Sequence, residues 1–534
     1  MRSVGRARFL LIAITIVTLV PFVKEAFRVD DPLFIWIAQQ ITKHPFDPYG
    51  FNVNWVSFAQ PMSIVMQNPP FSSYYIAAVA SIFGWSEPAL HLAFLFWAVM
   101  SILGTFALAR RFSPEPSIAA LLTLFTPVFL VSATSTMCDV MMLAFWVWAI
   151  EFWLAGLDRQ QWWRFLFAGA LISAAALTKY FGVTLVLLLA VYTVVRDWRL
   201  AKWLVFLLIP IAVLFNYDFL TEEKYGRGLF SAAMLASSSI SSATRPSHFA
   251  QMLMGLAFGG GSLVSAFFFA PFRSKRFLVA AVIAAVVFAG AFKFGITSWV
   301  YLETAEAPVW LEGGLFAAIG LGILALSVTD VFKQRNADAL LLVLWVIGTF
   351  LFATFFNWSV TARTFLPMAP AVAILVSRNL EQFQRTSELK YVSLCTAAGL
   401  AMLIAAADYR QANCAREAAM FYQKRYTAEA DNVRFLGHWG FQYYMQQWGA
   451  KAFDRSDPRI TDGKVLVGPF GDPNVNQVSM GRVATHDEST FKTLPLISTS
   501  SLGTGASFYS SFGGPLPWVI NQIPPERYFS VRAQ

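Results

Sequence analysis

Two adjacent carboxylates, Asp30 and Asp31, follow directly after the first apolar segment of the chain. Neighbouring acids can perform acid–base chemistry, in which one is a general base and the other positions it, a substrate or an ion. The same pair can also start a helix, because the first turn favours negative charge and a capping oxygen. The pair alone leaves both interpretations open, and it does not say which acid would be the base.

Two cations stand at the edges of later apolar runs: Lys179, which follows Leu177-Thr178, and Arg363, which precedes Thr364. An isolated basic side chain at a membrane edge commonly extends toward the polar interface. An anionic partner such as a lipid phosphate would also account for each position, and the planar guanidinium of Arg363 suits a bidentate contact. Phosphate binding is therefore the functional hypothesis for both residues.

Four further residues are candidates for a substrate site. Asp139 begins an apolar run and could cap it, while Glu87 stands at the start of another run, where a helix-start role is favoured. Tyr74 and Tyr75 lie in an apolar stretch, residues 72–83, that is too short to span a bilayer comfortably. The sequence contains no metal-ligand spacing, glycine-rich phosphate loop or nucleophile elbow, and its three cysteines are too few for a disulfide framework.

These residues are carried by a strongly apolar chain of 534 residues, of which 57% are hydrophobic and only 13% are charged. Soluble proteins carry about 25% charged residues. Runs of about 20 apolar residues can cross a bilayer, and the sequence predicts roughly thirteen transmembrane α-helices. They lie near residues 9–24, 89–109, 116–133, 138–156, 164–178, 180–196, 201–219, 249–271, 276–296, 310–329, 337–356, 363–378 and 391–408. The expected fold class is therefore an α-helical polytopic membrane protein.

The distribution of basic residues orients these spans. Lys and Arg gather in alternate loops, beginning with Arg6 and Arg8 and continuing with Arg110 and Arg111, and such an excess marks the cytoplasmic side. We expect the N-terminus in the cytoplasm and the first apolar run retained as a span, because no small-residue cleavage site follows it. The acidic pair then lies on the extracytoplasmic face. The net charge of +9 reflects these loops and indicates membrane lipids as partners, with no nucleic acid.

The composition divides the chain after residue 408. Residues 1–408 form the predicted transmembrane domain, with a long first extracytoplasmic loop over about residues 25–88. Residues 409–534 are polar and rich in Gly, Pro and Ser, and contain no spanning run. In this part we predict an amphipathic helix and several strands, which would form a small soluble extracytoplasmic α/β domain. The helix is expected over residues 432–450, and the strands over 464–468 and near 482–485, 507–510 and 528–532.

Several short motifs together resemble the C-type (GT-C fold) glycosyltransferase superfamily of polytopic membrane enzymes. The chain looks similar to bacterial relatives of the protein O-mannosyltransferases, the lipid A aminoarabinose transferases and the rhizobial galacturonic acid transferases. The second acid of the pair is Asp where the family pattern has Glu, and Thr364 replaces a Tyr. The motifs are Asp30-Asp31-Pro32-Leu33-Phe34, Asn68-Pro69-Pro70 with Tyr74-Tyr75, Phe83-Gly84 with Glu87 and then Ala109-Arg110-Arg111, Asp139, Leu177-Thr178-Lys179, and Arg363 with Pro367.

The resemblance implies a glycosyltransferase of the bacterial plasma (inner) membrane. It would move a hexose or pentose, with inversion, from a polyprenyl-phosphate-linked donor to a hydroxyl of a lipid, glycan or protein acceptor on the extracytoplasmic face. Asp30 would be the general base, Asp31 would orient it or the sugar, and Arg363 with Lys179 would bind the leaving phosphate. Asp30 and Arg363 should then face one cavity within about 10–15 Å of each other, with room for a single sugar phosphate. No tightly bound cofactor is expected, and a divalent metal requirement stays open.

Two other classes of function share many of these features. A membrane transporter or lipid flippase with an external lid domain would place ionisable residues on broken helices at mid-membrane, often within inverted repeats. Here most ionisable residues stand at the ends of spans, and no repeat is visible. A non-catalytic partner of an envelope assembly complex would keep the fold without needing the acids. An Asp30→Asn substitution separates these classes, because an enzyme loses turnover and a scaffold does not.

Overall fold

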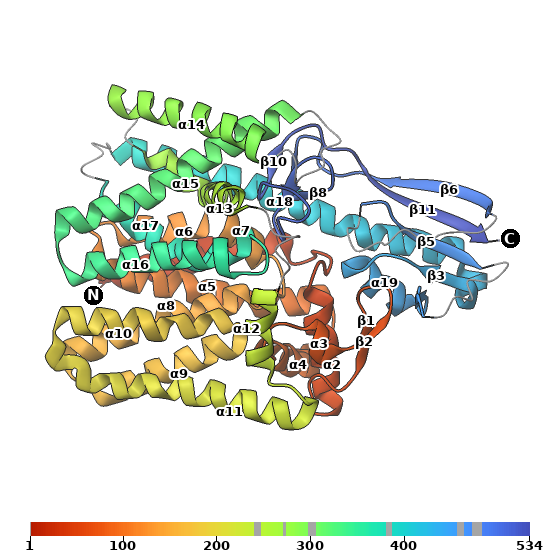
Figure 1. Cartoon of the computed structure of the whole chain (residues 1–534), viewed down its shortest axis with the longest axis horizontal. Helices are drawn as coiled ribbons and strands as arrows, with labels where there is room; N and C mark the ends of the chain where they lie inside the picture. Colours follow the sequence, from red (N-terminus) through yellow and green to blue (C-terminus); the bar gives the residue numbers. More distant parts are fainter. Residues whose placement is uncertain are drawn as a thin grey trace.

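The computed structural model describes residues 2–239, 247–270, 274–296, 306–380, 387–456, 464–471 and 483–533. Helices form one elongated body, and the larger strands gather at one end of it (Figure 1). The N-terminus lies at the end of the long axis that is remote from these strands, whereas the C-terminus lies among them. This arrangement places the beginning of the first span and the end of the C-terminal domain far apart.

Eight helices in the described part of the chain are long and apolar enough to cross a membrane. A ninth span results if α6 (Pro116–Leu124) and α7 (Pro127–Ala133), which are bent by 61° at their junction, are counted as one. Pro127 explains the break, because proline lacks the backbone N–H that a continuous helix needs. The chain is a multi-pass membrane protein. The eight helices are Val4–Phe22, Glu87–Phe112, Asp139–Arg159, Trp198–Tyr225, Lys275–Gly295, Ala307–Gln334, Ala337–Phe356 and Glu388–Arg425.

The thirteen predicted runs each coincide with a helix or a pair of helices, and the lower number of long spans follows from helix length. In four of the runs outside the eight long spans and the bent pair, the α-helix has 17 residues or fewer, below the length of about 20 that crosses a bilayer unaided. All four adjoin a 3-10 helix, and the three 3-10 helices are η2 (Tyr180–Val183), which lies between two of them, η4 (Val264–Phe269) and η6 (Ala362–Met368). The four short helices are α9 (Trp162–Thr178), α10 (Thr184–Arg196), α13 (His248–Ser262) and α17 (Ala369–Arg378).

The first loop contains most of the small elements that surround the acidic pair. After α1 (Arg2–Leu19) and η1 (Val20–Phe22), α2 (Asp31–Lys43) lies beside α4 (Phe71–Phe83), the apolar stretch predicted from its tyrosines. Between them stand the short helix α3 (Met62–Val65) and an antiparallel hairpin. The hairpin strands are β1 (Asn52–Asn54) and β2 (Ala59–Pro61).

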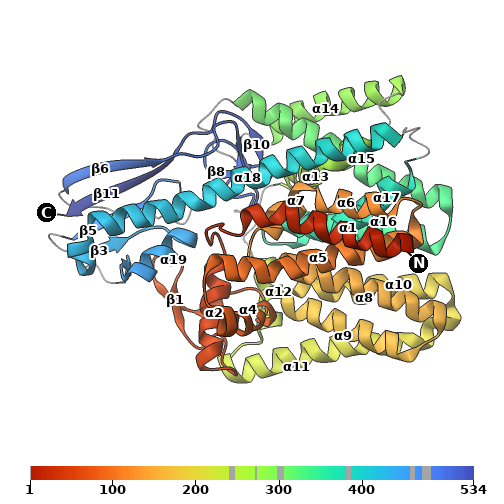
Figure 2. The same cartoon turned by 180° about the vertical axis from the view of Figure 1, so that it is seen from behind.

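The last membrane helix, α18 (Ser387–Arg425), runs without interruption from the helical body into the C-terminal region (Figure 2). The predicted boundary at residue 408 therefore falls inside a helix. The sheet that follows has the order β4-β3-β5-β11-β6, in which β3 is parallel to β4 and β5, and β11 is antiparallel to β5 and β6. Its strands are β3 (Val433–Phe435), β4 (Lys451–Ala452), β5 (Val465–Pro469), β6 (Val483–Phe491) and β11 (Glu526–Ala533).

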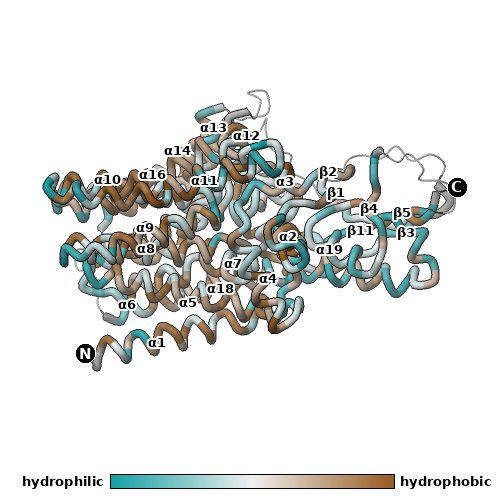
Figure 3. The backbone as a smooth tube through the Cα atoms, turned by 90° about the horizontal axis from the view of Figure 1, so that it is seen from below, coloured by the Kyte–Doolittle hydropathy of each residue, from teal (hydrophilic) through white to brown (hydrophobic). Residues whose placement is uncertain are grey.

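The predicted helix over residues 432–450 is shorter than expected. Only α19 (Trp439–Trp448) is helical, because Val433 and Phe435 bury alternate side chains as strand β3 and Gly437 turns the chain at a φ of +91°. The predicted strands correspond to β5, to β6, to the short β9 (Ala506–Ser507) and to β11. Figure 3 shows many hydrophobic residues along the helices of the helical body and a more hydrophilic chain around the sheet. The expectation of a polytopic helical protein with a small C-terminal α/β region is confirmed.

Candidate active site

Asp30 precedes α2 in the position of a helix cap, but its side chain makes no capping hydrogen bond. Val29, just before it, has a φ of +44°, a strained conformation for a β-branched residue. The Asp30 carboxylate instead pairs with Arg363, and Oδ2 of the acid lies 2.9 Å from Nη2 of the guanidinium. The two residues, expected within about 10–15 Å of each other, are therefore in direct contact.

Asp31 has a different environment from its neighbour, because its side chain is completely buried. Its Oδ2 accepts a hydrogen bond from the backbone N–H of Arg28 at 3.0 Å. Its Oδ1 accepts two from Thr136, one from the backbone N–H at 2.9 Å and one from the hydroxyl at 2.8 Å. Burial raises the pKa of Asp31 to about 6, although these hydrogen bonds lower it. Asp31 thus fastens the start of α2 to the connection between α7 and α8 (Asp139–Arg159).

Arg363 extends from η6, a turn that its neighbours hold firmly. The hydroxyl of Thr361 accepts the backbone N–H of Thr364 at 3.2 Å, and the two threonine hydroxyls are 2.7 Å apart. The indole N–H of Trp345 donates to the carbonyl of Pro367 at 2.7 Å. Thr364, the residue that departs from the family pattern, therefore stabilises the turn from which Arg363 reaches Asp30.

A buried carboxylate joins the two cations predicted from the sequence. Asp139 opens α8, and its Oδ1 lies 2.6 Å from Nζ of Lys179, while its Oδ2 lies 3.6 Å from Nη1 of Arg363. The same Nη1 contacts the sulfur of Met137. Sharing one carboxylate allows two like charges to lie close together. We call Asp30, Asp139, Lys179 and Arg363 the open cluster.

Solvent reaches the open cluster unevenly. The exposed fraction of the side chain is 31% for Asp30, 22% for Lys179, 14% for Arg363 and 1% for Asp139. Among the described residues, Nε of Arg363 is a buried donor without a hydrogen-bond partner. The exposed fractions of Asp30 and Lys179 leave room for an anion to approach the two cations from the side of Asp30, while Asp139 holds them from the buried side.

The structure gives the remaining candidates partners outside the open cluster. Tyr74 and Tyr75 donate their hydroxyls to backbone carbonyls of the first loop and of α5 (Glu87–Phe112), at 2.6 and 2.8 Å. Glu87 accepts the hydroxyl of Tyr444 at 2.7 Å and pairs with Arg416 at 2.8 Å. These contacts tie the first loop and the C-terminal region to α5. A role for the three residues in binding substrate stays a prediction.

A second set of charges, which the motifs did not single out, surrounds Arg28. This guanidinium pairs with Glu25, Nε to Oε1 at 2.9 Å, and with Asp408 of α18. The side chains are 7% exposed for Arg28 and 1% for each acid, and we call these three residues the buried cluster. Burial raises the pKa of Glu25 to about 7, although Arg28 lowers it. The signal used for Arg363, a basic residue at the edge of an apolar run, could also have identified Arg28.

Tyr509 from the C-terminal domain touches both clusters. The centroid of its ring lies 5.1 Å from Cζ of Arg28 and 5.3 Å from Cζ of Arg363. Its hydroxyl donates to Oδ2 of Asp408 at 3.1 Å. Burial raises the pKa of Tyr509, although Arg28 lowers it, so the group stays a protonated donor. No local pattern marks this residue, because its partners lie at least 101 positions away along the chain.

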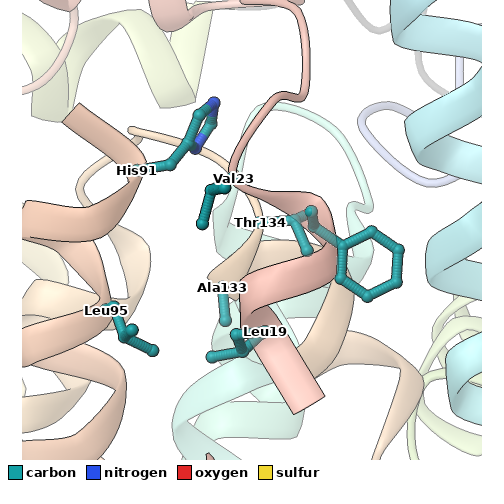
Figure 4. A pocket seen from close by; sticks show the side chains of 7 residues that line it. Leu19, Val23, His91, Leu95, Ala133 and Thr134 are labelled. Carbon is teal, nitrogen blue, oxygen red and sulfur yellow. The ribbon is translucent and has the colours of Figure 1, made fainter. Parts of the chain in front are cut away.

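A small pocket lies between α1, α5 and α7 (Figure 4). Its volume of about 10 Å³ accommodates roughly one water molecule. The ring of His91 at its edge contacts the backbone carbonyl of Glu25 at 3.0 Å. The pocket is too small for a sugar. The pocket is lined by Leu19, Phe22, Val23, His91, Leu95, Ala133 and Thr134.

Within the described residues, no group of three or more His, Cys, Asp or Glu side chains is arranged to hold a metal ion.

The sequence comparisons match a central part of the chain. Residues 67–221 match the family model of the dolichyl-phosphate-mannose-protein mannosyltransferases. This segment includes Asp139 and Lys179 of the open cluster. None of the curated proteins compared with the chain matches it significantly.

The structural comparisons cover most of the chain. The oligosaccharyltransferase of Archaeoglobus fulgidus, solved with a tethered acceptor peptide, is similar with a TM-score of 0.50 and 13% identity over 84% of this chain and 64% of that chain. Its apo form gives 0.50 and 13% over 85% and 65%. ArnT from Cupriavidus metallidurans in the apo state gives 0.46 and 15% over 88% and 93%. The chain spans just under two thirds of the oligosaccharyltransferase. It has the fold of the C-type membrane glycosyltransferases.

Proposed function

We propose that this protein is a membrane glycosyltransferase that moves a sugar from a polyprenyl-phosphate-linked donor to an acceptor hydroxyl. The observation that carries the proposal is the contact between Asp30 and Arg363 beside a second cation, Lys179. A partly exposed carboxylate next to two cations provides a base and an anion site in one place. The family matched by residues 67–221 takes its name from dolichyl-phosphate-mannose, a donor of this chemical class.

Arg363 and Lys179 bind the donor phosphate. In the structure, the carboxylate of Asp30 is paired with Nη2 of Arg363. The phosphate can therefore bind this nitrogen only after Asp30 and Arg363 have separated. Asp139 keeps hold of both cations during this exchange, because it contacts them through separate oxygens. As the bond between the anomeric carbon and the phosphate oxygen breaks, the two cations stabilise the charge that grows on the leaving polyprenyl phosphate.

Asp30 is the general base. It takes the proton of the acceptor hydroxyl while that oxygen attacks the anomeric carbon from the face opposite the phosphate, which inverts the anomeric configuration. Donor binding frees Asp30 from Arg363 at the moment when a base is needed. Asp31 is the weaker candidate because it is fully buried and its two oxygens already accept three hydrogen bonds. It positions the turn that carries Asp30.

The site is proposed to lie on the extracytoplasmic face of a bacterial plasma membrane, with the N-terminus in the cytoplasm and the C-terminal domain outside. The separation of the two chain ends along the long axis supports this orientation (Figure 1). So does the contact of the C-terminal residue Tyr509 with Arg363, which puts the open cluster at the end of the helical body that bears the domain. The acceptor is a lipid, a glycan or a protein.

The test is a transfer assay with purified protein, labelled polyprenyl-phosphate sugars and membrane extract. We expect label transfer by the wild-type protein and a loss of about 10²- to 10⁴-fold in the Asp30→Asn variant, which keeps the shape but not the base. The matched control is Asp338→Asn, in the first turn of α16 (Ala337–Leu351), whose carboxylate accepts the hydroxyl of Tyr192 at 2.8 Å.

The outcomes separate the classes of function. Transfer by wild type and Asp338→Asn but not by folded Asp30→Asn supports the enzyme and its base. Equal transfer by all three proteins removes Asp30 from catalysis. Movement of intact lipid across a vesicle membrane without transfer of sugar would instead identify a flippase.

A further inference from the structure

The C-terminal domain reaches back to the turn that carries Arg363. The backbone N–H of Ala362 donates to the carbonyl of Phe508 at 2.9 Å. Three residues further along, the N–H of Ser511 donates to the carbonyl of Val360 at 2.9 Å, and its hydroxyl accepts the N–H of Val360 at 3.2 Å. These contacts on both sides of Tyr509 fix its backbone against the backbone that precedes Arg363.

The ring of Tyr509 is in contact with two guanidinium groups. Arg28 and Arg363 lie 5.1 and 5.3 Å from its centroid, within the range in which the electron-rich face of an aromatic ring attracts a cation. Tyr509 is only 8% exposed, so water competes little with these contacts. The side chain thus connects a guanidinium of the buried cluster with one of the open cluster.

The hydroxyl of Tyr509 fixes the position of the far end of the side chain. It donates to Oδ2 of Asp408 at 3.1 Å, and the same carboxylate accepts the hydroxyl of Thr499 and pairs with Arg28. Asp408 belongs to α18 and Thr499 to the C-terminal domain. The side chain therefore cannot swing away from the two guanidinium groups without breaking the hydrogen bond to Asp408.

Arg363 needs a contact that holds its guanidinium in place when the sugar donor binds. Asp30 is then displaced from Arg363, and the remaining contacts of the guanidinium are Asp139 at 3.6 Å, the sulfur of Met137 and the ring of Tyr509. Of these only the ring presents an extended flat surface to the planar guanidinium. We propose that Tyr509 is a positioning residue, supplied by the C-terminal domain, that holds Arg363 ready for the donor phosphate. This inference rests on the proposed function.

The test compares two substitutions of Tyr509. Tyr509→Phe keeps the ring and removes the hydroxyl, whereas Tyr509→Leu removes the ring. We expect Tyr509→Leu to raise the KM for the donor about tenfold with a smaller change in kcat, and Tyr509→Phe to restore most of that loss. The matched control is Tyr192→Leu, because Tyr192 also donates to an aspartate, Asp338, and has an arginine, Arg196, 6.0 Å from its ring centroid.

A binding measurement separates the two proposals. The thermal shift of purified protein is recorded with increasing undecaprenyl phosphate, which needs no turnover. We expect saturable stabilisation of wild type and Tyr192→Leu, and an apparent Kd about tenfold weaker for Tyr509→Leu. Equal affinity of wild type and Tyr509→Leu overturns the positioning role and leaves the proposed function intact. No stabilisation of wild type overturns both, and equal weakening by Tyr192→Leu reduces Tyr509 to a general structural residue.

Discussion

The open cluster and the buried cluster are built from the same kinds of side chain and differ in their access to solvent. Each contains arginine paired with two carboxylates, and Tyr509 contacts the arginine of both. In the open cluster Asp30 is 31% exposed and Arg363 14%, whereas in the buried cluster Arg28 is 7% exposed and its partners 1%. Burial therefore assigns the two clusters different roles.

The difference follows from the cost of removing charge from water. A buried guanidinium must find its partners within the protein, and Arg28 contacts Glu25, Asp408 and the carbonyl of Val131. Because Arg28 is only 7% exposed, a ligand in solvent has little access to it, and the residue ties the first loop to α18. Arg363 has a partner, Asp30, that is 31% exposed, and in the proposed function an anion takes the place of this partner.

The largest expected effect comes from breaking the buried cluster. Arg28→Met leaves Glu25 and Asp408 buried without a counter-charge, which should lower the free energy of unfolding by about 3–5 kcal/mol. The measurement is the apparent Tm of the detergent-purified protein. Arg410→Met is the control, because the pair of Arg410 with Glu417 is 30% and 43% exposed, and surface pairs contribute about 1 kcal/mol or less. Equal Tm values for the two variants would contradict the structural role of Arg28.

The open cluster should respond in activity rather than in stability. Arg363→Lys keeps the charge but loses the planar fork that suits a phosphate, so we expect kcat/KM to fall about a hundredfold while Tm changes little. Arg378→Lys is the matched control, since Arg378 is 13% exposed and pairs with Asp330 at 3.2 Å at the other end of α17. A similar loss of activity in Arg363→Lys and Arg378→Lys would contradict a specific role of Arg363 in binding the donor phosphate.

The sequence predicted the open cluster better than the buried one, because the residues of the open cluster are marked by their immediate neighbours in the sequence. Asp30, Lys179 and Arg363 are charged residues at the ends of apolar runs, so signals from single residues and their immediate neighbours were enough. Asp31 and Asp30 are identical in type and adjacent, and only burial distinguishes the anchored acid from the exposed one. That distinction depends on Thr136, which is 105 positions away along the chain.

The fold shows the same division between local and long-range information. Apolar runs located the helices, but they could not show that α18 continues past residue 408, because its last turns lose their apolar character while remaining helical. The contact of Tyr509 with Arg28 and Arg363 depends on how the C-terminal domain returns to the membrane body. No periodicity or motif in the segment around Tyr509 predicts that this segment packs against the membrane helices.

The smallest expected effect is a dependence of stability on pH that originates in the buried cluster. Three buried carboxylates, Glu25, Asp31 and Asp408, surround the single guanidinium of Arg28, so a proton on one of them relieves an excess of negative charge. Burial raises the pKa of Glu25 to about 7 and that of Asp31 to about 6. The folded protein therefore binds more protons than the unfolded chain between about pH 4.5 and 7, and its stability falls as the pH rises.

Between pH 6 and 8 the loss should amount to about 2 kcal/mol, most of it from Glu25. The measurement is the apparent Tm at constant ionic strength over that range, for wild type, Glu25→Gln and Glu417→Gln. The Gln at position 25 cannot titrate, so that variant should lose most of the slope, whereas the exposed Glu417 should leave it unchanged. A wild-type Tm that rises with pH would mean that Arg28 outweighs burial and holds all three acids ionised. In that case the two clusters would differ in access alone and not in charge state.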